Sequence, residues 1–324
     1  MLSFQKFIKK NMGLSSKSPQ SVLVLGAGAI GSLFGWKLAQ AGLDVCVTAR
    51  SDYKHIKQKG IQIQSIWGND TFVPSAVTTL DELPLKPVDY LLISTKSIPA
   101  YNLHSKIKHL VSKGTSIVLL QNGIGIENEF ALTFPQSHII SGLAFVCVTK
   151  TKPGLVEHKD YGRLVFGDFP TEVSGKTQSL IDAFSSVNVP CKGSTTIQRE
   201  RWKKLLWNAP FNPISVVGGG ISTKEILENE TTFSLTKKVM SEVFNLAKAD
   251  GYPLSDNAIE RNIDDTKLMV PYKTSMLIDY EHKRELETEV ILGNAIRLGK
   301  KFGVETTGMQ SLYQQLLDIP TIKS

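Results

Sequence analysis

The sequence predicts an α/β protein built in two parts, a mostly parallel sheet with crossover helices followed by an all-helical domain. Short apolar runs alternate with amphipathic segments early in the chain, the strand signal disappears after Thr196, and helical periodicity then continues almost to the end. With 324 residues the chain is long enough for about two domains at roughly 150 residues each. We therefore expect a basic N-terminal extension over residues 1–20, a sheet domain over 21–193 and a helical domain over 194–324.

The first domain is expected to contain at least five strands. These are the short apolar runs Val22–Leu25, Val45–Thr48, Tyr90–Ser94, Ser116–Leu120 and Ile139–Phe145. Between the first two runs, Ile30–Ala41 has apolar residues at helical spacing and is followed by Gly42, a residue type that commonly ends helices. Farther on, Gly154–Asp168 alternates apolar and polar residues around Gly162, which predicts an antiparallel hairpin appended to the sheet.

The second domain is expected to be helical throughout. The segments with helical periodicity are Arg199–Trp207, Thr231–Ala249, Ser255–Lys267, Leu286–Phe302 and Met309–Leu317. Proline inside a helix removes a hydrogen bond and clashes with the preceding turn. We therefore expect the helix that begins near Arg199 to kink or end at Pro210, so that Asn212 need not share a face with the residues before it.

Composition and charge exclude several classes of protein. The hydrophobic content of 41% can bury a sizeable core, which excludes a disordered or collagen-like chain. Of the formal net charge of +7, the first twenty residues hold four lysines and no acid, and the segment Arg199–Lys204 holds the other +3. So short a basic run cannot track a phosphate backbone, and we expect no nucleic-acid partner.

The sequence also indicates how the chain is placed in the cell. No apolar run approaches the ~20 residues that cross a bilayer, so we expect no membrane span. The N-terminal extension lacks the continuous apolar core of a secretory signal and is interpreted as a frayed terminus, with an organelle-targeting leader as the alternative. Cys46, Cys147 and Cys191 are odd in number and widely spaced, which predicts buried, reduced thiols of a cytoplasmic protein. The histidines lack metal spacing, so we expect no metal site.

A glycine-rich turn follows the first strand. Its residues are Gly26, Ala27, Gly28, Ala29, Ile30 and Gly31, a G-x-G-x-x-G motif that opens the first helix. Gly26 permits a tight turn, Gly28 lets backbone amides approach a pyrophosphate, and Gly31 allows close packing of helix on strand. Because strand, motif and helix agree, the first domain is predicted to be a Rossmann-type dinucleotide-binding domain.

The end of the second strand distinguishes NAD from NADP. An acid at this place binds the ribose 2′-hydroxyl of NAD. Here Arg50 follows the strand, with Lys54 one helical turn on, and an arginine can pair with a 2′-phosphate through two hydrogen bonds. The prediction is NADP, with NAD kept as an alternative by the nearby Asp52.

Several polar residues are candidates for chemistry. Lys96 and Asn122 follow strand ends, where ligands bind in open α/β sheets, although a solvated lysine and a simple turn would have the same sequence. Lys204 and Asn208 are four residues apart and so share one helix face. The alternative for this pair is a basic helix with an asparagine cap.

Taken together, these motifs resemble the ketopantoate reductase family. The resemblance rests on the glycine-rich turn, Thr95-Lys96, Gln121-Asn122-Gly123, Trp202-Lys203-Lys204-Leu205 with Asn208 and Asn212-Pro213, Ser275-Met276-Leu277 and Glu287-Thr288-Glu289. Their order and spacing agree with the family from Ser21 almost to the C-terminus. The resemblance implies NADPH-dependent reduction of 2-dehydropantoate to pantoate, a step of pantothenate and coenzyme A synthesis.

The resemblance also implies roles for individual residues. It makes Lys204 the catalytic lysine and Glu287 the acid where cofactor and substrate meet. The implied substrate contacts are Asn122, Lys204, Asn208, Asn212 and Ser275. The implied cofactor contacts beyond the glycine-rich turn and Arg50 are Lys96, Asn122, Val148 and Glu287. The enzyme would act on a small 2-keto acid as a monomer or homodimer.

Three departures from the family pattern leave alternatives open. Ser222 or Thr223 stands near the place of a further substrate-contacting asparagine. The usual Pro-Thr-Glu-Ile-Asp is replaced by Glu285–Glu289, so Glu289 competes with Glu287 for the acidic role. The third departure is Pro210, which could reshape the site. A paralogous reductase of another 2-keto acid is therefore the first alternative. A non-catalytic NADP-binding sensor is the second.

Overall fold

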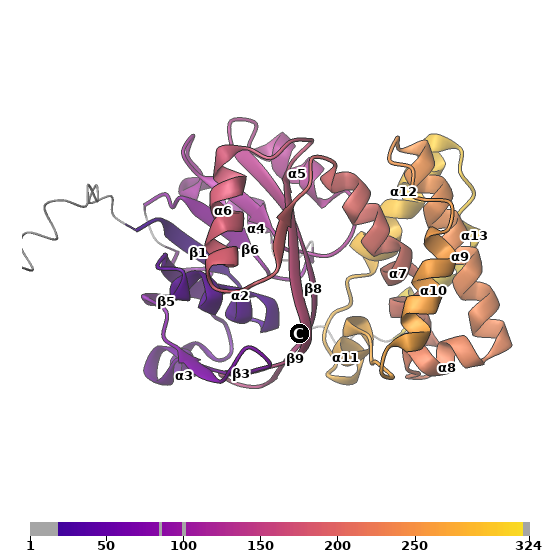
Figure 1. Ribbon diagram of the computed structural model, residues 1–324, viewed down its shortest axis with the longest axis horizontal. Helices are drawn as coiled ribbons and strands as arrows, with labels where there is room; N and C mark the ends of the chain where they lie inside the picture. The colour runs from indigo at the N-terminus through magenta and orange to yellow at the C-terminus, as the bar shows by residue number, and fades with distance from the viewer. Residues whose placement is uncertain (1–18, 84–85, 99–101, 320–324) are drawn as a thin grey trace, which may run out of the picture.

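The computed structural model describes residues 19–83, 86–98 and 102–319, and the statements below concern these ranges. Almost all of the basic N-terminal extension falls outside the described residues. The described chain forms a sheet with flanking helices, beside which lies a bundle of helices from the C-terminal part (Figure 1). The predicted fold class is confirmed.

Ten strands form one mixed sheet in the order β4-β3-β9-β8-β7-β6-β1-β2-β5, with β10 beside β9. Their bounds are β1 (Ser21–Leu25), β2 (Asp44–Thr48), β3 (Ile61–Ser65), β4 (Asp70–Phe72), β5 (Ala76–Thr78), β6 (Tyr90–Ile93), β7 (Ser116–Leu119), β8 (His138–Lys152), β9 (Leu155–Asp168) and β10 (Cys191–Gly193). The run from β5 through β2, β1, β6 and β7 to β8 is parallel. All five predicted strands are present in it.

The central strands are apolar throughout because both faces of the sheet are covered. On β1, Val22 and Val24 pack with helices α2 (Ala29–Gln40) and α6 (Gly175–Ser186). The alternate residues Leu23 and Leu25 face the opposite core. The other helices of this half are α3 (Tyr53–Lys59), α4 (Leu103–Ile107) with the short η2 (Lys108–Leu110), and α5 (Ile126–Thr133). Burial on both faces is the usual environment of parallel strands.

The predicted hairpin within Gly154–Asp168 is wrong. This stretch is one long strand, β9, which pairs antiparallel with β8 over almost its full length. Gly162 is not a turn but lies inside β9 at a register shift, where Phe145 pairs with Arg163 and Val146 with Tyr161. A β-carbon on Gly162 would lie 2.1 Å from the Trp67 ring, and its φ is +123°. The glycine therefore marks a bulge and a close contact rather than a chain reversal.

Of the predicted kink or end at Pro210, the end is wrong. Helix α7 (Ile197–Val217) continues through both Pro210 and Pro213, and both rings are buried. Tertiary packing compensates for the missing hydrogen bonds, because Ala209, Phe211 and the residues around them are enclosed by the helical core.

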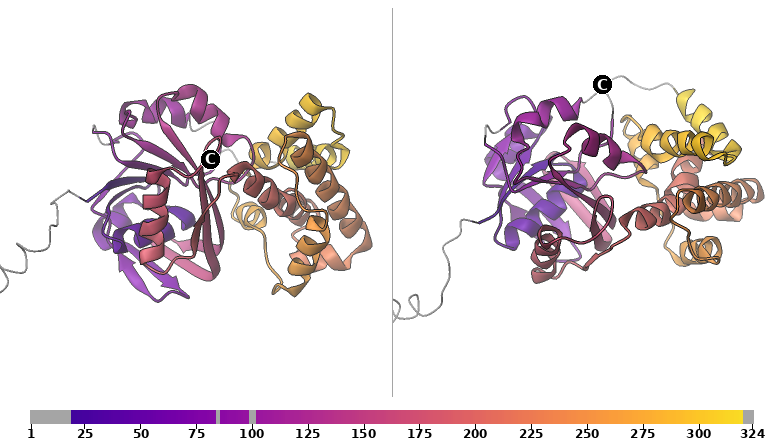
Figure 2. Two further views of the ribbon diagram at one scale, coloured as in Figure 1. Left: turned by 45° about the horizontal axis from the view of Figure 1, so that its top comes forward. Right: turned by 90° about the horizontal axis from the view of Figure 1, so that it is seen from above.

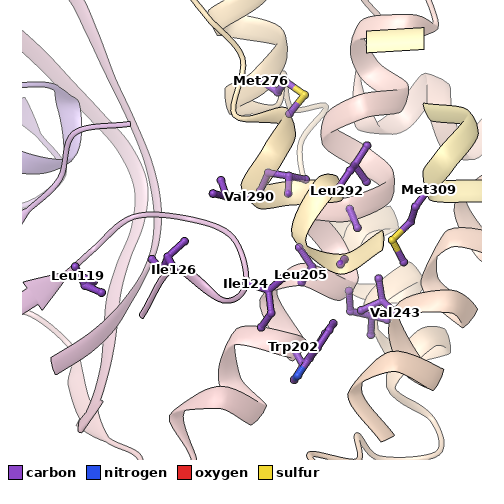
Figure 3. Packing of buried hydrophobic residues seen from close by; sticks show 14 of the residues in the cluster. Leu119, Ile124, Ile126, Trp202, Leu205, Val243, Met276, Val290, Leu292 and Met309 are labelled. Atoms are coloured by element: carbon purple, nitrogen blue, oxygen red, sulfur yellow. The ribbon is translucent and has the colours of Figure 1, made fainter. Parts of the chain in front are cut away.

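The remaining helices surround α7. They are α8 (Thr223–Glu228), α9 (Glu230–Ala249), α10 (Ala258–Leu268), α11 (Ser275–Glu281), a π-helical turn η3 (Glu289–Gly293), α12 (Asn294–Phe302) and α13 (Thr307–Leu317). Figure 3 shows Trp202 and Leu205 of α7 beside Val243 of α9 and Met309 of α13. The indole of Trp202 also donates to Asp250 (2.9 Å).

The first turns of α7 join the two halves of the molecule. Two further views show this helix running from the sheet into the bundle (Figure 2). At the junction, Arg201 forms an ion pair with Glu127 of α5, and neither side chain has any exposed surface. The helix that carries Lys204 is therefore anchored to the loops at the carboxyl edge of the sheet.

Candidate active site

A cavity of about 1370 Å³ lies between the carboxyl ends of the parallel strands and the helical bundle. Most of the residues singled out from the sequence line it. From the sheet half these are Gly26, Ala27, Gly28, Ala29, Ile30, Arg50, Lys96, Asn122 and Val148. From the helical half they are Lys204, Asn208, Ser275 and Glu287. Gly31 and Asn212 are not among the lining residues.

The glycine-rich turn fits a dinucleotide. Gly28 is the N-cap of α2, which has no side-chain cap, so the first amides of the helix remain for a ligand. A β-carbon on Gly28 would have no heavy atom within 4 Å, which leaves its surface open to the cavity. Gly26 has φ +100° and lies against Thr95. A β-carbon on Gly31 would lie 2.1 Å from the carbonyl oxygen of Gly26, so this glycine serves packing and not contact with a ligand.

The end of β2 presents to the cavity an arginine that is unpaired among the described residues, whereas the nearby acid, Asp52, lines the cavity with its carboxylate already paired. Arg50 is exposed and lines the cavity. Asp52 is buried, forms an ion pair with Lys150 and accepts from the amide of Gly154 (3.3 Å). Its carboxylate therefore already has partners within the protein, Lys150 and the Gly154 amide. Lys54 is exposed but is not among the residues that line the cavity.

Lys204 points from α7 toward the loop after β7 and the middle of β8. Its Nζ donates to Asn122 Oδ1 (2.9 Å) and to the carbonyl oxygen of Ala144 (2.7 Å). The ammonium also lies 5.4 Å from the centre of the Phe145 ring. Two hydrogen bonds, one to the loop after β7 and one to strand β8, hold the amine in one orientation.

The surroundings of Lys204 favour its neutral form. Burial lowers the pKa of Lys204 to about 7, the positive charge of Arg201 acts in the same direction, and Glu287 opposes both. An amine with a pKa near 7 can both hold and release a proton at neutral pH.

Asn122 connects Lys204 to Glu287. Its Oδ1 accepts from Lys204, and its side chain also hydrogen-bonds to Glu287, for which Nδ2 is the available donor. Glu287 Oε1 accepts from the Ser97 amide (3.0 Å). Burial raises the pKa of Glu287, with Asp279 acting in the same direction, while the Ser97 amide, Lys96 and Asn122 lower it. The three side chains form a continuous polar line across the cavity.

Lys96 reaches across to the helical half. Its Nζ lies 2.6 Å from Asp279 Oδ2 and donates to the carbonyl oxygen of Glu285 (3.0 Å). Asp279 is also paired with Arg284 (3.2 Å). Lys96 is thus a bridge between the two halves as well as a lining residue of the cavity.

Asn212 lies in a small recess beside the main cavity. The recess holds about 10 Å³, roughly one water molecule, and is lined also by Ser275, Asp279 and Glu287. Asn212 Oδ1 is buried and has no hydrogen-bond partner among the described residues. The helix is continuous through Pro210, so Asn212 follows Lys204 by two turns. The helix does not end at Pro210, but Asn212 lines the recess and not the main cavity that Lys204 lines.

The structure shows which of the alternative site residues line the cavity. Ser222 caps α8 through a reciprocal pair of hydrogen bonds with Glu225, and the hydroxyl of Thr223 accepts from the Tyr272 amide (3.2 Å). Neither lines the cavity. Glu289 is bound by Tyr313 and Arg297 outside the cavity, whereas Glu287 lines it.

Sequence reasoning missed many of the lining residues, and four of them bear on the chemistry. These are Cys147, Trp207, Tyr272 and Asp279. The thiol of Cys147 and the hydroxyl of Tyr272 hydrogen-bond across the cavity. Cys147 sits inside a strand, and Tyr272 follows a helix end, so nothing in their spacing brings them together. All three cysteines are free and only partly buried, where full burial was expected.

Two further properties of the described residues bear on function. None of the helices in the described part of the chain is long and apolar enough to cross a membrane. Among the same residues, no group of three or more histidine, cysteine or acidic side chains is arranged to hold a metal ion.

Comparisons with known proteins identify relatives over almost the whole chain. A family model described as ketopantoate reductase PanE/ApbA matches residues 22–171, and the model of its C-terminal part matches 196–319. The 2-dehydropantoate 2-reductase of Nostoc sp. is 34% identical over 298 residues, which cover 90% of this chain and 93% of the relative.

Solved structures agree with these relatives. The 2-dehydropantoate 2-reductase of Methylococcus capsulatus matches with a TM-score of 0.86 at 42% identity and covers 94% of this chain and 98% of its own. The same enzyme of Geobacter metallireducens matches with a TM-score of 0.86 at 31% identity, covering 93% and 100%.

Proposed function

This chain belongs to the ketopantoate reductase family and is an oxidoreductase, and from that premise we propose that it reduces 2-dehydropantoate to (R)-pantoate with NADPH. The observation that carries the proposal is the line Lys204–Asn122–Glu287 in the cavity, with the pKa of Lys204 lowered to about 7. The product would enter pantothenate and coenzyme A synthesis.

Lys204 would be the proton donor. Bound NADPH supplies the hydride to the keto carbon. Negative charge then develops on the keto oxygen, and the Lys204 ammonium would stabilise this charge and donate its proton to it. Such general acid catalysis contributes typically about 10²–10⁴-fold. Asn122 and the Ala144 carbonyl hold the ammonium in place before substrate arrives.

The sheet half would bind the cofactor. The open surface of Gly28 and the uncapped amides of α2 suit the pyrophosphate, and Arg50 suits a 2′-phosphate. Lys96, Asn122 and Val148 line the cavity farther along the sheet edge and would meet the nicotinamide end, together with Glu287.

The helical half would bind the substrate. Asn208 and Asn212 provide neutral amides on successive turns of α7, and Ser275 at the start of α11 would contact the substrate carboxylate. The unpartnered Oδ1 of Asn212 is available to accept from a substrate hydroxyl. Glu287, beside this recess, would bind a substrate hydroxyl and keep Lys204 protonated through Asn122.

The test is turnover with a panel of 2-keto acids, followed by the loss of NADPH absorbance. We expect ketopantoate to be reduced with the highest kcat/KM, and pyruvate-like acids to be poor substrates. Efficient reduction of pyruvate-like acids with no reduction of ketopantoate would contradict the proposal.

A second candidate is the reduction of another 2-keto acid by the same residues. Trp207, Met269 and Tyr272 line the cavity beside Asn208, which gives this wall an aromatic and apolar character suited to a larger substituent. The panel should therefore include keto acids with bulky branched or aromatic side chains. A sensor without activity is disfavoured because the cavity keeps a lysine whose pKa suits proton transfer.

We place the enzyme in the cytoplasm, where its three free thiols would stay reduced, and expect it to act as a monomer or homodimer.

A further inference from the structure

Arg201 is a deeply buried charged residue near the cavity. It lies on α7 one turn before Lys204, and only 1% of it is exposed. Its Nε donates to Glu127 and to Ser141 Oγ (2.9 Å), and Ser141 Oγ donates to the same Glu127 oxygen (2.6 Å). This much would be expected of a structural ion pair.

A second nitrogen of Arg201 binds the backbone of the loop that carries Asn122. Its Nη1 donates to the carbonyl oxygens of Gln121 (3.0 Å) and Gly123 (3.2 Å). These are the two residues on either side of Asn122. The guanidinium therefore binds the backbone on both sides of Asn122, the residue that accepts a hydrogen bond from Lys204.

A single side chain thus fixes both partners of the Lys204–Asn122 contact. Arg201 is one helical turn from Lys204, and it binds the loop that carries Asn122. Only an arginine has a rigid fork with enough donors for a carboxylate and two carbonyls together.

We propose that Arg201 is a positioning residue for the reduction, which aligns the Asn122 loop with Lys204 and, through its charge, favours release of the proton that Lys204 carries. The inference rests on the proposed function, in which Lys204 is the proton donor.

The charges around Lys204 support the direction of this effect. Arg201 on its own helix lowers the pKa of Lys204, and Glu287 from the segment before η3 raises it. Arg163 of β9 faces the same ring of Phe145, at 4.4 Å from its centre. Glu127 balances the charge of Arg201 at Nε, whereas Nη1 binds the loop that carries Asn122.

Two sets of variants separate geometry from charge. Arg201→Lys keeps the positive charge but cannot reach both carbonyls. Arg201→Met combined with Glu127→Met removes both charges together, because either partner left alone would be an unpaired buried charge. Glu242→Gln is the control: Glu242 is buried, accepts from the amides of Gly308 and Met309 at the start of α13, and lies outside the cavity lining.

Three measurements are made on each full-length variant. Thermal unfolding reports stability, the pH profile of kcat reports turnover, and acetylation of Lys204 by acetic anhydride at several pH values, read by mass spectrometry, reports its pKa without substrate. We expect Arg201→Lys to lose roughly tenfold to a hundredfold in kcat with the pKa of Lys204 unchanged. The double variant should lose kcat and also shift the pKa of Lys204 and the alkaline limb of the profile upward.

The proposal is overturned if a folded Arg201→Lys keeps wild-type kcat, or if the double variant leaves the pKa of Lys204 where the Glu242→Gln control leaves it. Should the double variant not fold, Arg201→Lys still decides the geometric part. If the wild-type enzyme does not reduce ketopantoate, the proposed function fails, but acetylation still shows whether Arg201 acts on Lys204. The two failures are thereby distinguishable.

Discussion

At the scale of single residues, the cavity concentrates charges that the fold would be more stable without. Lys204 is held toward its neutral form by burial, and Glu287 toward its protonated form by burial, within one connected set of hydrogen bonds. Perturbed groups that face each other in a cavity are typical of active sites. The sequence singled out all three residues, but not the hydrogen bonds by which Asn122 joins the other two.

Lys204→Met should lower kcat by about 10²–10⁴-fold with a smaller effect on KM, because the proton donor is lost. In the wild-type enzyme, kcat/KM should fall as the pH rises through about 7, since Lys204 must carry its proton to act. Initial rates over a pH series test both points. Unchanged turnover in Lys204→Met would remove Lys204 from the mechanism.

The same residue should affect stability with a defined sign. The pKa of Lys204 is about 7 in the folded chain and near 10.5 when unfolded, so the unfolded state binds more protons between these values. The contribution of Lys204 to the free energy of unfolding therefore rises with pH across this window. Lys204→Met should raise Tm more at pH 6 than at pH 10. Equal shifts at both pH values would contradict the lowered pKa.

Arg50→Ala should raise KM for NADPH at least about tenfold and leave KM for NADH nearly unchanged, because only the first cofactor has a 2′-phosphate for the guanidinium. Lys54→Ala is the matched control, an exposed cation on the next helix that does not line the cavity. An equal rise in KM for both cofactors would show that Arg50 does not bind the 2′-phosphate.

At the scale of elements, the turn into α2 and the length of α7 carry the site. The glycines of the turn have different tasks, since Gly28 opens to the cavity and Gly31 lets α2 lie against the preceding turn. In α7, two prolines reside in a helix that local rules would have ended. Its continuity places Lys204, Asn208 and Asn212 on successive turns.

The two glycines should respond differently to alanine. Gly31→Ala forces a β-carbon to within 2.1 Å of the Gly26 carbonyl oxygen and should lower stability by about 1–3 kcal/mol. Gly28→Ala meets no heavy atom of the protein within 4 Å, so it should keep Tm while raising KM for NADPH. Thermal unfolding and cofactor titration of both variants give the comparison. A stable Gly31→Ala would show that α2 can move away from the sheet.

At the scale of the whole molecule, contacts across the cavity hold the two halves together. These contacts are the buried pair Arg201–Glu127, the pair Lys96–Asp279 and the Ser97–Glu287 hydrogen bond. The basic segment Arg199–Lys204, which contributes to the net charge, is not an exposed patch: Arg201 is buried against Glu127 and Lys203 is paired with Glu200. Its charge serves the junction and the site.

Removal of residues 1–18 should leave kcat, KM and Tm unchanged while lowering the net charge from +7 to +3, because that segment holds four lysines and no acid. Among the described residues, the cavity lining begins at Gly26, after the extension. Steady-state kinetics and unfolding of the shortened chain test this. A loss of activity would assign the extension a part in binding.

The sequence by itself determined the class of fold, the five central strands, the dinucleotide turn and a part of the residues that line the cavity. These depend on local pattern, since burial on both faces makes a parallel strand apolar and a phosphate turn needs glycine at set positions. Only the tertiary structure decided that Gly154–Asp168 is one strand, that α7 passes through Pro210, and that Arg201, Cys147 and Tyr272 belong around the site. Packing between segments distant in the chain overrides local preference at these places, and no spacing in the sequence records which buried charge will meet which loop.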